Sequence, residues 1–279
     1  MSIYVLADSA SDLSYALEEQ HPLRIIPLKV ETSTGSYRDG IDIDAPTLYS
    51  LLDTEIPKTS LPNGEEVLCA IRELPEDAKI LGITVSSGLS GTINSFRYAK
   101  EALPEGKMAV IDTKNIAIGE GFLSLYALDL IAEGYSFEEI VSKVTEAVPR
   151  SKIFYTLETL KYLRAGGRIG KVSGFIGDLL DIKPIISCNE DGIYYTVTKA
   201  RGRKKAIREL VKRVSAMVEG HTYYLALSHG NVPEEAESIK EEIRPLIEGS
   251  KGFFMNQITP VLGVHTGPGL LGLGAFLLD

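Results

Sequence analysis

Residues 80–92 constrain the fold of this chain more than any other stretch. They begin as an apolar run that ends at Val85 and continue into a turn rich in serine and glycine. Residues 93–103 then have the apolar spacing of a helix. Such a strand, turn and helix form the repeating unit of a parallel sheet, with the turn at the carboxyl end of the strand. Free N–H groups and hydroxyl groups predict a site for an anion or a carboxylate in this turn. The alternative is that the same residues only cap the helix and turn the chain.

Strands and helices alternate through the first half of the chain. Strands are predicted at residues 3–7, 24–30, 80–85 and 107–111, and helices at residues 14–20, 47–53, 65–74, 93–103, 119–134 and 136–149. The last helix begins with Ser136 and has Glu139 three residues later, which is the spacing of a capping box. Residues 31–44 are expected to form a turn or hairpin, and residues 57–64 a loop. The alternation predicts an α/β domain with a doubly wound parallel sheet over residues 1–150.

The pattern changes after about Arg150. Strands are predicted at residues 152–156, 182–188, 193–200, 223–228, 252–257 and 270–278, and helices at residues 157–163, 204–218 and 233–248. Two of these strands flank the polar turn 189–192 and are therefore expected to pair as a hairpin. We therefore expect a second domain at residues 151–279, of α+β class with a mixed or antiparallel sheet.

Charge and cysteine content limit the function. The 279 residues carry a formal net charge of -9, which argues against binding to nucleic acid or to an anionic membrane surface. Cys69 and Cys188 are far apart and suggest no disulfide framework. No apolar stretch reaches the length of a transmembrane helix. We therefore expect a cytoplasmic protein with no nucleic-acid partner and no stable membrane insertion.

Three common site motifs do not fit. The four histidines are not spaced like metal ligands, so no metal site is expected. The glycine-rich loop 166–171 fails as a phosphate-binding P-loop, because its glycines are too close together and Val172 replaces the Ser or Thr. Residues 88–92 fail narrowly as a nucleophile elbow, because Thr92 replaces the second glycine. A serine hydrolase using Ser90, His265 and an aspartate therefore stays open as an alternative.

Other polar residues each have a structural and a functional interpretation. His265 lies in the glycine-rich stretch 263–269, which predicts a tight loop. Its imidazole is either a buried structural group or a donor to a bound carboxylate. Asp8, Asp12 and Asp39 are expected to act as caps or turn formers when each is taken alone. The basic residues are either a solvated face or a docking surface for a phosphate-bearing partner: Arg164, Arg168, Lys171, Arg201, Arg203, Lys204 and Lys205.

Five motifs follow one another along the chain: Asp8-Ser9-Ala10-Ser11-Asp12, Thr59-Ser60-Leu61-Pro62-Asn63, Ser86-Ser87-Gly88-Leu89-Ser90-Gly91-Thr92, Leu163-Arg164-Ala165-Gly166-Gly167-Arg168-Ile169 and His265-Thr266-Gly267-Pro268-Gly269. In this order and at these separations they resemble the DegV family of bacterial fatty-acid-binding proteins, also called FakB. The resemblance runs through the whole chain. One departure is Asn63, where the family usually has serine.

The resemblance implies a two-domain α/β protein that buries one long-chain fatty acid and holds its carboxylate between the domains. The implied ligand-binding residues are Thr59, Ser60, Ser90, Gly91, His265 and Thr266. The implied polar network or partner surface consists of Asp39, Arg168 and Arg201. No catalytic residue, cofactor or metal is implied.

The resemblance also implies a partner. In the family a separate fatty acid kinase, FakA, phosphorylates the bound acid, and the product passes to phospholipid synthesis. The resemblance therefore implies a subunit that presents the substrate and is not itself an enzyme. A monomer is expected. The alternative is a serine hydrolase or a phosphotransferase that uses the same loops. The acyl tunnel is expected at a helix over residues 175–180 and at Ile185, Ile186, Phe253 and Phe254, whose other interpretation is ordinary core packing.

Overall fold

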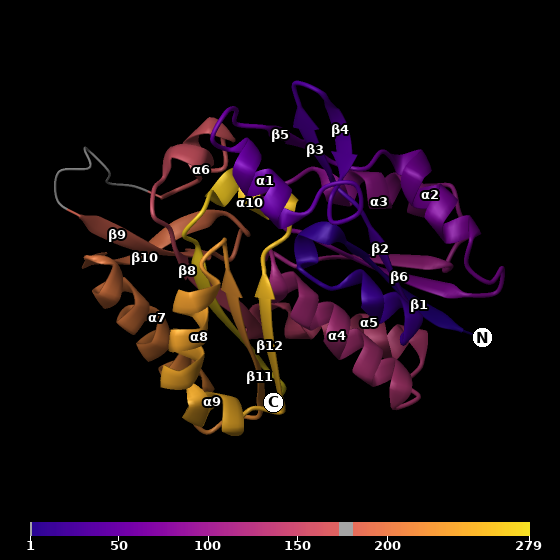
Figure 1. Ribbon diagram of the computed structural model, residues 1–279. Coiled ribbons are helices and arrows are strands. Elements are labelled where there is room, and N and C mark those ends of the chain that lie inside the picture. Colours follow the sequence, from indigo (N-terminus) through magenta and orange to yellow (C-terminus); the bar gives the residue numbers. More distant parts are fainter. Residues whose placement is uncertain (1, 173–180) are drawn as a thin grey trace.

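The computed structural model describes residues 2–172 and 181–279, and its first half is built on a parallel sheet (Figure 1). The strands are β1 (Ile3–Asp8), β2 (Leu23–Ile26), β6 (Lys79–Thr84) and β7 (Met108–Asp112), and they lie in the order β2-β1-β6-β7. Helices α2 (Gly64–Arg72) and α3 (Thr92–Glu101) pack on one face. Helices α4 (Ile118–Ala132) and α5 (Phe137–Ala147) pack on the other. The predicted doubly wound sheet is confirmed.

A small antiparallel sheet follows β2 because Pro27 interrupts the predicted strand at residues 24–30. Proline has no N–H to donate to a sheet, so the chain leaves the parallel sheet there. It then forms β3 (Lys29–Thr32), which pairs with β4 (Gly35–Arg38) as the expected hairpin. The region predicted as loop 57–64 supplies a third strand, β5 (Lys58–Ser60), on the other edge of β3. Helix α1 (Ala45–Leu51) connects β4 to β5.

The N-terminal connection differs from the prediction in one respect. The α-helix predicted at residues 14–20 is instead the 3-10 helix η2 (Tyr15–Glu19). A shorter 3-10 turn, η1 (Ser9–Ser11), directly follows β1. The capping box at Ser136 and Glu139 is present at the start of α5. After α5 the turn η3 (Val148–Arg150) leads into the second half.

The second half contains a six-stranded mixed sheet. Its strands are β8 (Ser151–Thr156), β9 (Ile182–Cys188), β10 (Tyr194–Arg201), β11 (Tyr223–His229), β12 (Gly252–Gln257) and β13 (Leu271–Leu277). Their order is β10-β9-β8-β13-β11-β12, and all neighbours are antiparallel except β11 and β12. The predicted mixed or antiparallel sheet is confirmed, and β9 and β10 form the predicted hairpin. The boundary near residue 150 stays a prediction.

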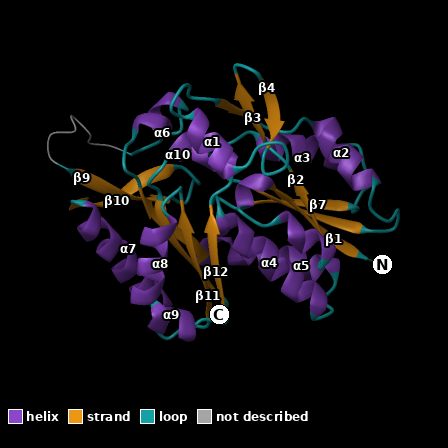
Figure 2. Cartoon of the chain, viewed as in Figure 1, coloured by secondary structure: helices purple, strands orange, loops and turns teal. Residues whose placement is uncertain are grey.

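Helices cover one face of this sheet in Figure 2. Helix α7 (Arg203–Val218) and helix α8 (Pro233–Glu242) bury their apolar sides against β9, β11 and β13. The predicted helix 233–248 is divided, because Pro245 begins the separate helix α9 (Arg244–Glu248). Helix α6 (Lys161–Ala165) follows β8. No helix among the described residues is long and apolar enough to cross a membrane.

Helix α4 lies between the two large sheets and joins the halves of the molecule. It contacts β1 and β6 of the parallel sheet and β8 and β13 of the mixed sheet. Its side chains are apolar around most of the helix, and Phe122 and Leu123 are completely buried. Because both sheets pack on the same helix, a single hydrophobic core runs through both halves.

The stretch predicted as a tight loop at residues 263–269 is partly helical, which corrects that prediction. Helix α10 (Pro260–Thr266) carries His265 and Thr266 in its last turn and ends at Gly267, whose φ is +66°. Gly263 lies inside the helix because α10 packs closely on α1, where an added Cβ would lie 2.5 Å from the Leu48 side chain. Glycine is therefore needed for close packing here and not for a turn.

Candidate functional site

Five of the predicted site residues line one cavity between the two halves, which we call the polar cavity. They are Thr59, Ser90, Arg168, His265 and Thr266. The remaining wall is mostly apolar, and the space between the wall atoms, including any part open to solvent, is about 490 Å³.

A hydrogen bond between Thr59 and His265 closes the cavity across the two halves. The Thr59 Oγ1 atom on β5 lies 2.7 Å from Nε2 of His265 on α10. Ser90 is held separately, since its hydroxyl oxygen lies 2.8 Å from that of Thr92, the first residue of α3. The Thr266 hydroxyl donates to the Leu262 carbonyl oxygen at 3.0 Å. Hydroxyl-bearing residues from three segments therefore line the same cavity as the imidazole of His265.

The imidazole of His265 is neutral at physiological pH. Its burial, and secondarily the positive charge of Arg168, lower its pKa to about 4. Its Nδ1 atom has no hydrogen-bond partner among the described residues. This atom packs against Gly166, where an added Cβ would lie only 2.1 Å away. The ring can thus donate or accept one hydrogen bond at Nε2, and no carboxylate of the described residues bonds to it to orient it as a general base.

In the described part of the chain, Ser90, His265 and an aspartate are not arranged as the catalytic triad of a serine hydrolase. Ser90 and His265 line the same cavity, but the partner of His265 is Thr59 and the partner of Ser90 is Thr92. A serine nucleophile needs a base within hydrogen-bond reach and a group that orients this base. Residues 2–172 and 181–279 also contain no group of His, Cys, Asp or Glu side chains that could hold a metal ion.

Four other predicted site residues lie outside the cavity wall. The Ser60 hydroxyl donates to the Glu31 carboxylate at 2.6 Å. Gly91 is the N-cap residue of α3 beside Ser90. Asp39 is completely buried behind the wall, and Arg201 is exposed at the end of β10.

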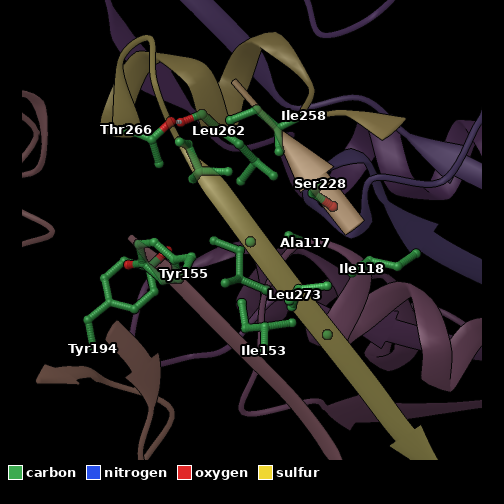
Figure 3. Close-up of a pocket in the computed structure, with 14 residues that line it drawn as sticks. Ala117, Ile118, Ile153, Tyr155, Tyr194, Ser228, Ile258, Leu262, Thr266 and Leu273 are labelled. Carbon is green, nitrogen blue, oxygen red and sulfur yellow. Dashed lines mark hydrogen bonds between the residues drawn. The ribbon is translucent and has the colours of Figure 1, made fainter. Parts of the chain in front are cut away.

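A second cavity, which we call the apolar cavity, adjoins the first. Both cavities share Ile116, Tyr194, Leu262 and Thr266 as wall residues. The apolar cavity extends along β13, and the space between its wall atoms, including any part open to solvent, is about 440 Å³ (Figure 3). Ile118, Ile153 and Leu273 are among the aliphatic residues that surround its far part in Figure 3.

Glycine residues on β13 make room for the apolar cavity. Gly272 and Gly274 line this cavity, and Leu271 beside them packs in the core beneath α7 and α8. A Cβ on Gly274 would already lie 3.1 Å from the Ile153 side chain. The sequence contains these glycines but does not show the empty space beside them.

Among the described residues, the four side chains that the sequence suggested for an acyl tunnel pack elsewhere. Ile185 and Phe253 pack in the core beneath α7 and α8, and Ile186 and Phe254 pack in the central core. None of the four is among the residues that line either cavity. The other predicted tunnel segment, residues 175–180, lies outside the described residues. Apolar periodicity marks buried faces but does not distinguish a cavity wall from close packing.

Comparison with known proteins identifies relatives over the whole chain. The model of the DegV family, described as "Uncharacterised protein, DegV family", matches residues 2–277. A DegV domain-containing protein from Clostridium acetobutylicum is 37% identical over 276 residues, which cover 98% of both chains.

Solved structures with the same fold include proteins described as binding fatty acids. A fatty-acid-binding DegV family protein from Thermus thermophilus has a TM-score of 0.93 and 30% identity, with 100% of both chains covered. A stearic-acid-binding protein from Eubacterium ventriosum has a TM-score of 0.87 and 28% identity, covering 99% of this chain and 98% of its own. With a family model that spans nearly the whole sequence, this chain belongs to the DegV family.

Proposed function

We propose that this protein binds one long-chain fatty acid, with the carboxylate in the polar cavity and the acyl chain in the apolar cavity. The observation that carries this proposal is that the two cavities adjoin and share Ile116, Tyr194, Leu262 and Thr266 as wall residues. A ligand that occupies both cavities needs a polar head and a long apolar body. The fatty-acid-binding DegV protein of Thermus thermophilus, with the same fold, supports this ligand class.

The carboxylate has several donors available in the polar cavity. The proposal assigns the binding to the hydroxyl groups of Thr59 and Ser90, the imidazole of His265 and the N–H of Gly91. Arg168 supplies a positive charge at the wall, and its Nη1 atom is fixed by the Gly166 carbonyl oxygen at 2.6 Å. Hydrogen bonds to a charged group are stronger than those between neutral groups, so each donor contributes to affinity.

The apolar cavity supplies most of the affinity for the chain. Burial of each methylene group contributes about 0.8 kcal/mol. Affinity is therefore expected to increase with chain length until the chain reaches the end of the cavity.

Substitution of Thr59 tests the assignment of the polar cavity. Thr59→Val removes the hydroxyl that lies beside His265 but keeps the side-chain shape. We expect fatty-acid affinity to fall roughly tenfold in a titration with palmitic acid. Thr145→Val is the matched control, because this exposed threonine on α5 donates only to the Val141 carbonyl oxygen. Unchanged binding by Thr59→Val would contradict the assignment.

We further propose that the bound acid is presented to a partner fatty acid kinase and that this protein, a cytoplasmic monomer, does no chemistry alone. The absence of an oriented base at His265 in the described chain supports a binding role. Arg201, exposed at the end of β10, is then part of the partner surface.

A reconstituted kinase reaction tests this second step. With a DegV-partner kinase and ATP, Arg201→Ala is expected to slow acyl-phosphate formation while leaving the affinity for palmitic acid unchanged. Arg168→Ala is expected to lower both, since Arg168 lines the polar cavity. Equal losses of kinase turnover and of affinity in Arg201→Ala would reject the assignment of Arg201 to the partner surface.

A further inference from the structure

Three buried side chains make hydrogen bonds to the backbone of the wall of the polar cavity. They are Asp8, Ser9 and Asp39, which we call the carboxyl frame. Asp8 and Asp39 have 0% of their surface exposed and Ser9 has 2%. None of the three lines the cavity, but each bonds to the backbone of a residue that does.

Asp8 connects two segments of the wall. Its Oδ1 atom accepts a hydrogen bond from the Ala10 N–H at 3.0 Å, and its Oδ2 atom accepts one from the Val85 N–H at 2.8 Å. Ala10 and Val85 both line the polar cavity. The bond to Ala10 alone would be an ordinary cap of η1. The bond to Val85, 77 residues later in the sequence, is not local and fixes the end of β6 against η1.

Ser9 and Asp39 connect two further segments. The Ser9 Oγ atom accepts from the Leu28 N–H at 3.0 Å and donates to Asp39 Oδ2 at 2.7 Å. Asp39 Oδ1 accepts from the Val261 N–H at 2.9 Å, in the first turn of α10. Leu28 and Val261 also line the polar cavity. The frame therefore ties η1, the end of β6, the start of β3 and helix α10 into one unit.

Each of these segments leads to a residue proposed to bind the carboxylate. Val85 precedes the turn that carries Ser90, and Val261 lies one helical turn before His265. Leu28 precedes β3, which pairs with the strand β5 that carries Thr59. A displacement of Val85, Val261 or Leu28 would therefore move a residue proposed to bind the carboxylate.

The structure assigns Asp8, through its own bonds, and Ser9, together with Asp39, a role as positioning residues that hold the donors of the polar cavity in place for an acidic ligand head. This inference rests on the proposed function, because it takes a fatty-acid carboxylate as the occupant. The frame is expected to affect recognition of the head and not of the acyl chain, since none of its members lines the apolar cavity.

Two substitutions in the frame and two ligands of equal chain length test this role. Ser9→Ala removes both bonds of the serine hydroxyl, and Asp39→Asn removes the acceptor for that hydroxyl while keeping an acceptor for Val261. Binding of palmitic acid is compared with binding of 1-hexadecanol. In each variant we expect palmitic acid affinity to fall about tenfold and hexadecanol affinity to change less than about twofold.

Tyr223→Phe is the control for a general loss of stability. Its hydroxyl donates to the Leu246 carbonyl oxygen at 2.7 Å and lies outside both cavities. This variant is expected to lower Tm but to leave the ratio of the two affinities unchanged. Thermal unfolding shows which frame variants are folded, and one folded variant is enough for the comparison.

The remaining outcomes would overturn the inference. Equal losses for acid and alcohol, or no loss for the acid, would show that the frame does not position the donors. Failure of both variants to fold would show that the frame holds the fold and not the cavity. A wild-type protein that binds hexadecanol but not palmitic acid, or neither ligand, would instead contradict the proposed function on which the inference rests.

Discussion

At the scale of single residues, the polar cavity depends on close contacts that only small side chains allow. The motifs that resemble the DegV family include Thr59, Ser90, His265 and Arg168, and all four line the same cavity. The sequence could not show that Thr59 bonds to His265, because 206 residues separate them. It also could not show which glycine makes room for the imidazole, since glycine content alone does not distinguish a turn from a close approach.

Gly166 is predicted to be necessary for the position of His265. In Gly166→Ala the new Cβ would overlap the Nδ1 atom of His265, which is only 2.1 Å from its ideal position. The ring must move away, which breaks its bond to Thr59. We expect palmitic acid affinity to fall about tenfold, measured by equilibrium titration. The exposed neighbour Ala165→Ser serves as the control, and wild-type affinity in Gly166→Ala would contradict the prediction.

At the scale of elements, strands and helices with strong patterns are predictable from the sequence, and short elements stabilised by tertiary contacts are not. The parallel strands, α4, α5 and the β9–β10 hairpin have clear apolar periodicity or turn signals. Strand β5 has only three residues and exists because it pairs with β3. Helix α10 contains a proline and a glycine, and it is held by packing against α1 and by bonds from the carboxyl frame. Such contacts between distant segments cannot be read from local pattern.

Strand β13 is predicted to limit the length of the acyl chain that the protein can bind. Gly272→Leu would place a side chain in the apolar cavity, whereas the Cβ of Gly272→Ala would make only ordinary contacts, the nearest at 3.5 Å. In the leucine variant the longest acids should lose affinity by about fourfold for each excluded methylene group. Decanoic acid should bind as it does to the wild type. Competition titrations over a series of chain lengths would measure this, and an equal loss at every length would contradict it.

At the scale of the whole molecule, buried carboxyl groups lie where the two halves meet. Burial raises the pKa of Asp8 and of Asp12 to about 7 and that of Asp39 to about 6. Burial also raises the pKa of Glu120 on α4 well above its usual range. Asp12 accepts the Thr259 N–H at 2.9 Å, so this acidic group also contacts the start of α10. The sequence favoured simple caps for these aspartates, because burial at an interface between halves is a property of the fold.

These groups predict that the protein becomes more stable as pH falls from 8 toward 6. A carboxyl group with a raised pKa in the folded state binds more protons there than in the unfolded chain, so its contribution to stability is lost as pH rises through the folded pKa. The buried, neutral His265 changes the stability in the opposite direction as pH falls. Its pKa is lowered to about 4, so its contribution is present above about 6.5 and is lost as pH falls toward 4.

Urea unfolding at several pH values would test this balance. The free energy of unfolding is expected to increase between pH 8 and pH 6, and below about pH 6.5 the neutral His265 makes the further increase smaller. Asp12→Asn should make the increase smaller, because it removes one of the groups that take up a proton on folding. A wild-type protein that is more stable at pH 8 than at pH 6 would contradict the prediction.

The central claim is that the polar and apolar cavities together hold one fatty acid. Native mass spectrometry of the purified protein, followed by organic extraction and mass analysis of the extract, tests it most directly. The account predicts one fatty acid per chain, or uptake of one equivalent when oleic or palmitic acid is added to an empty protein. A protein that contains no fatty acid and takes up neither acid would contradict it.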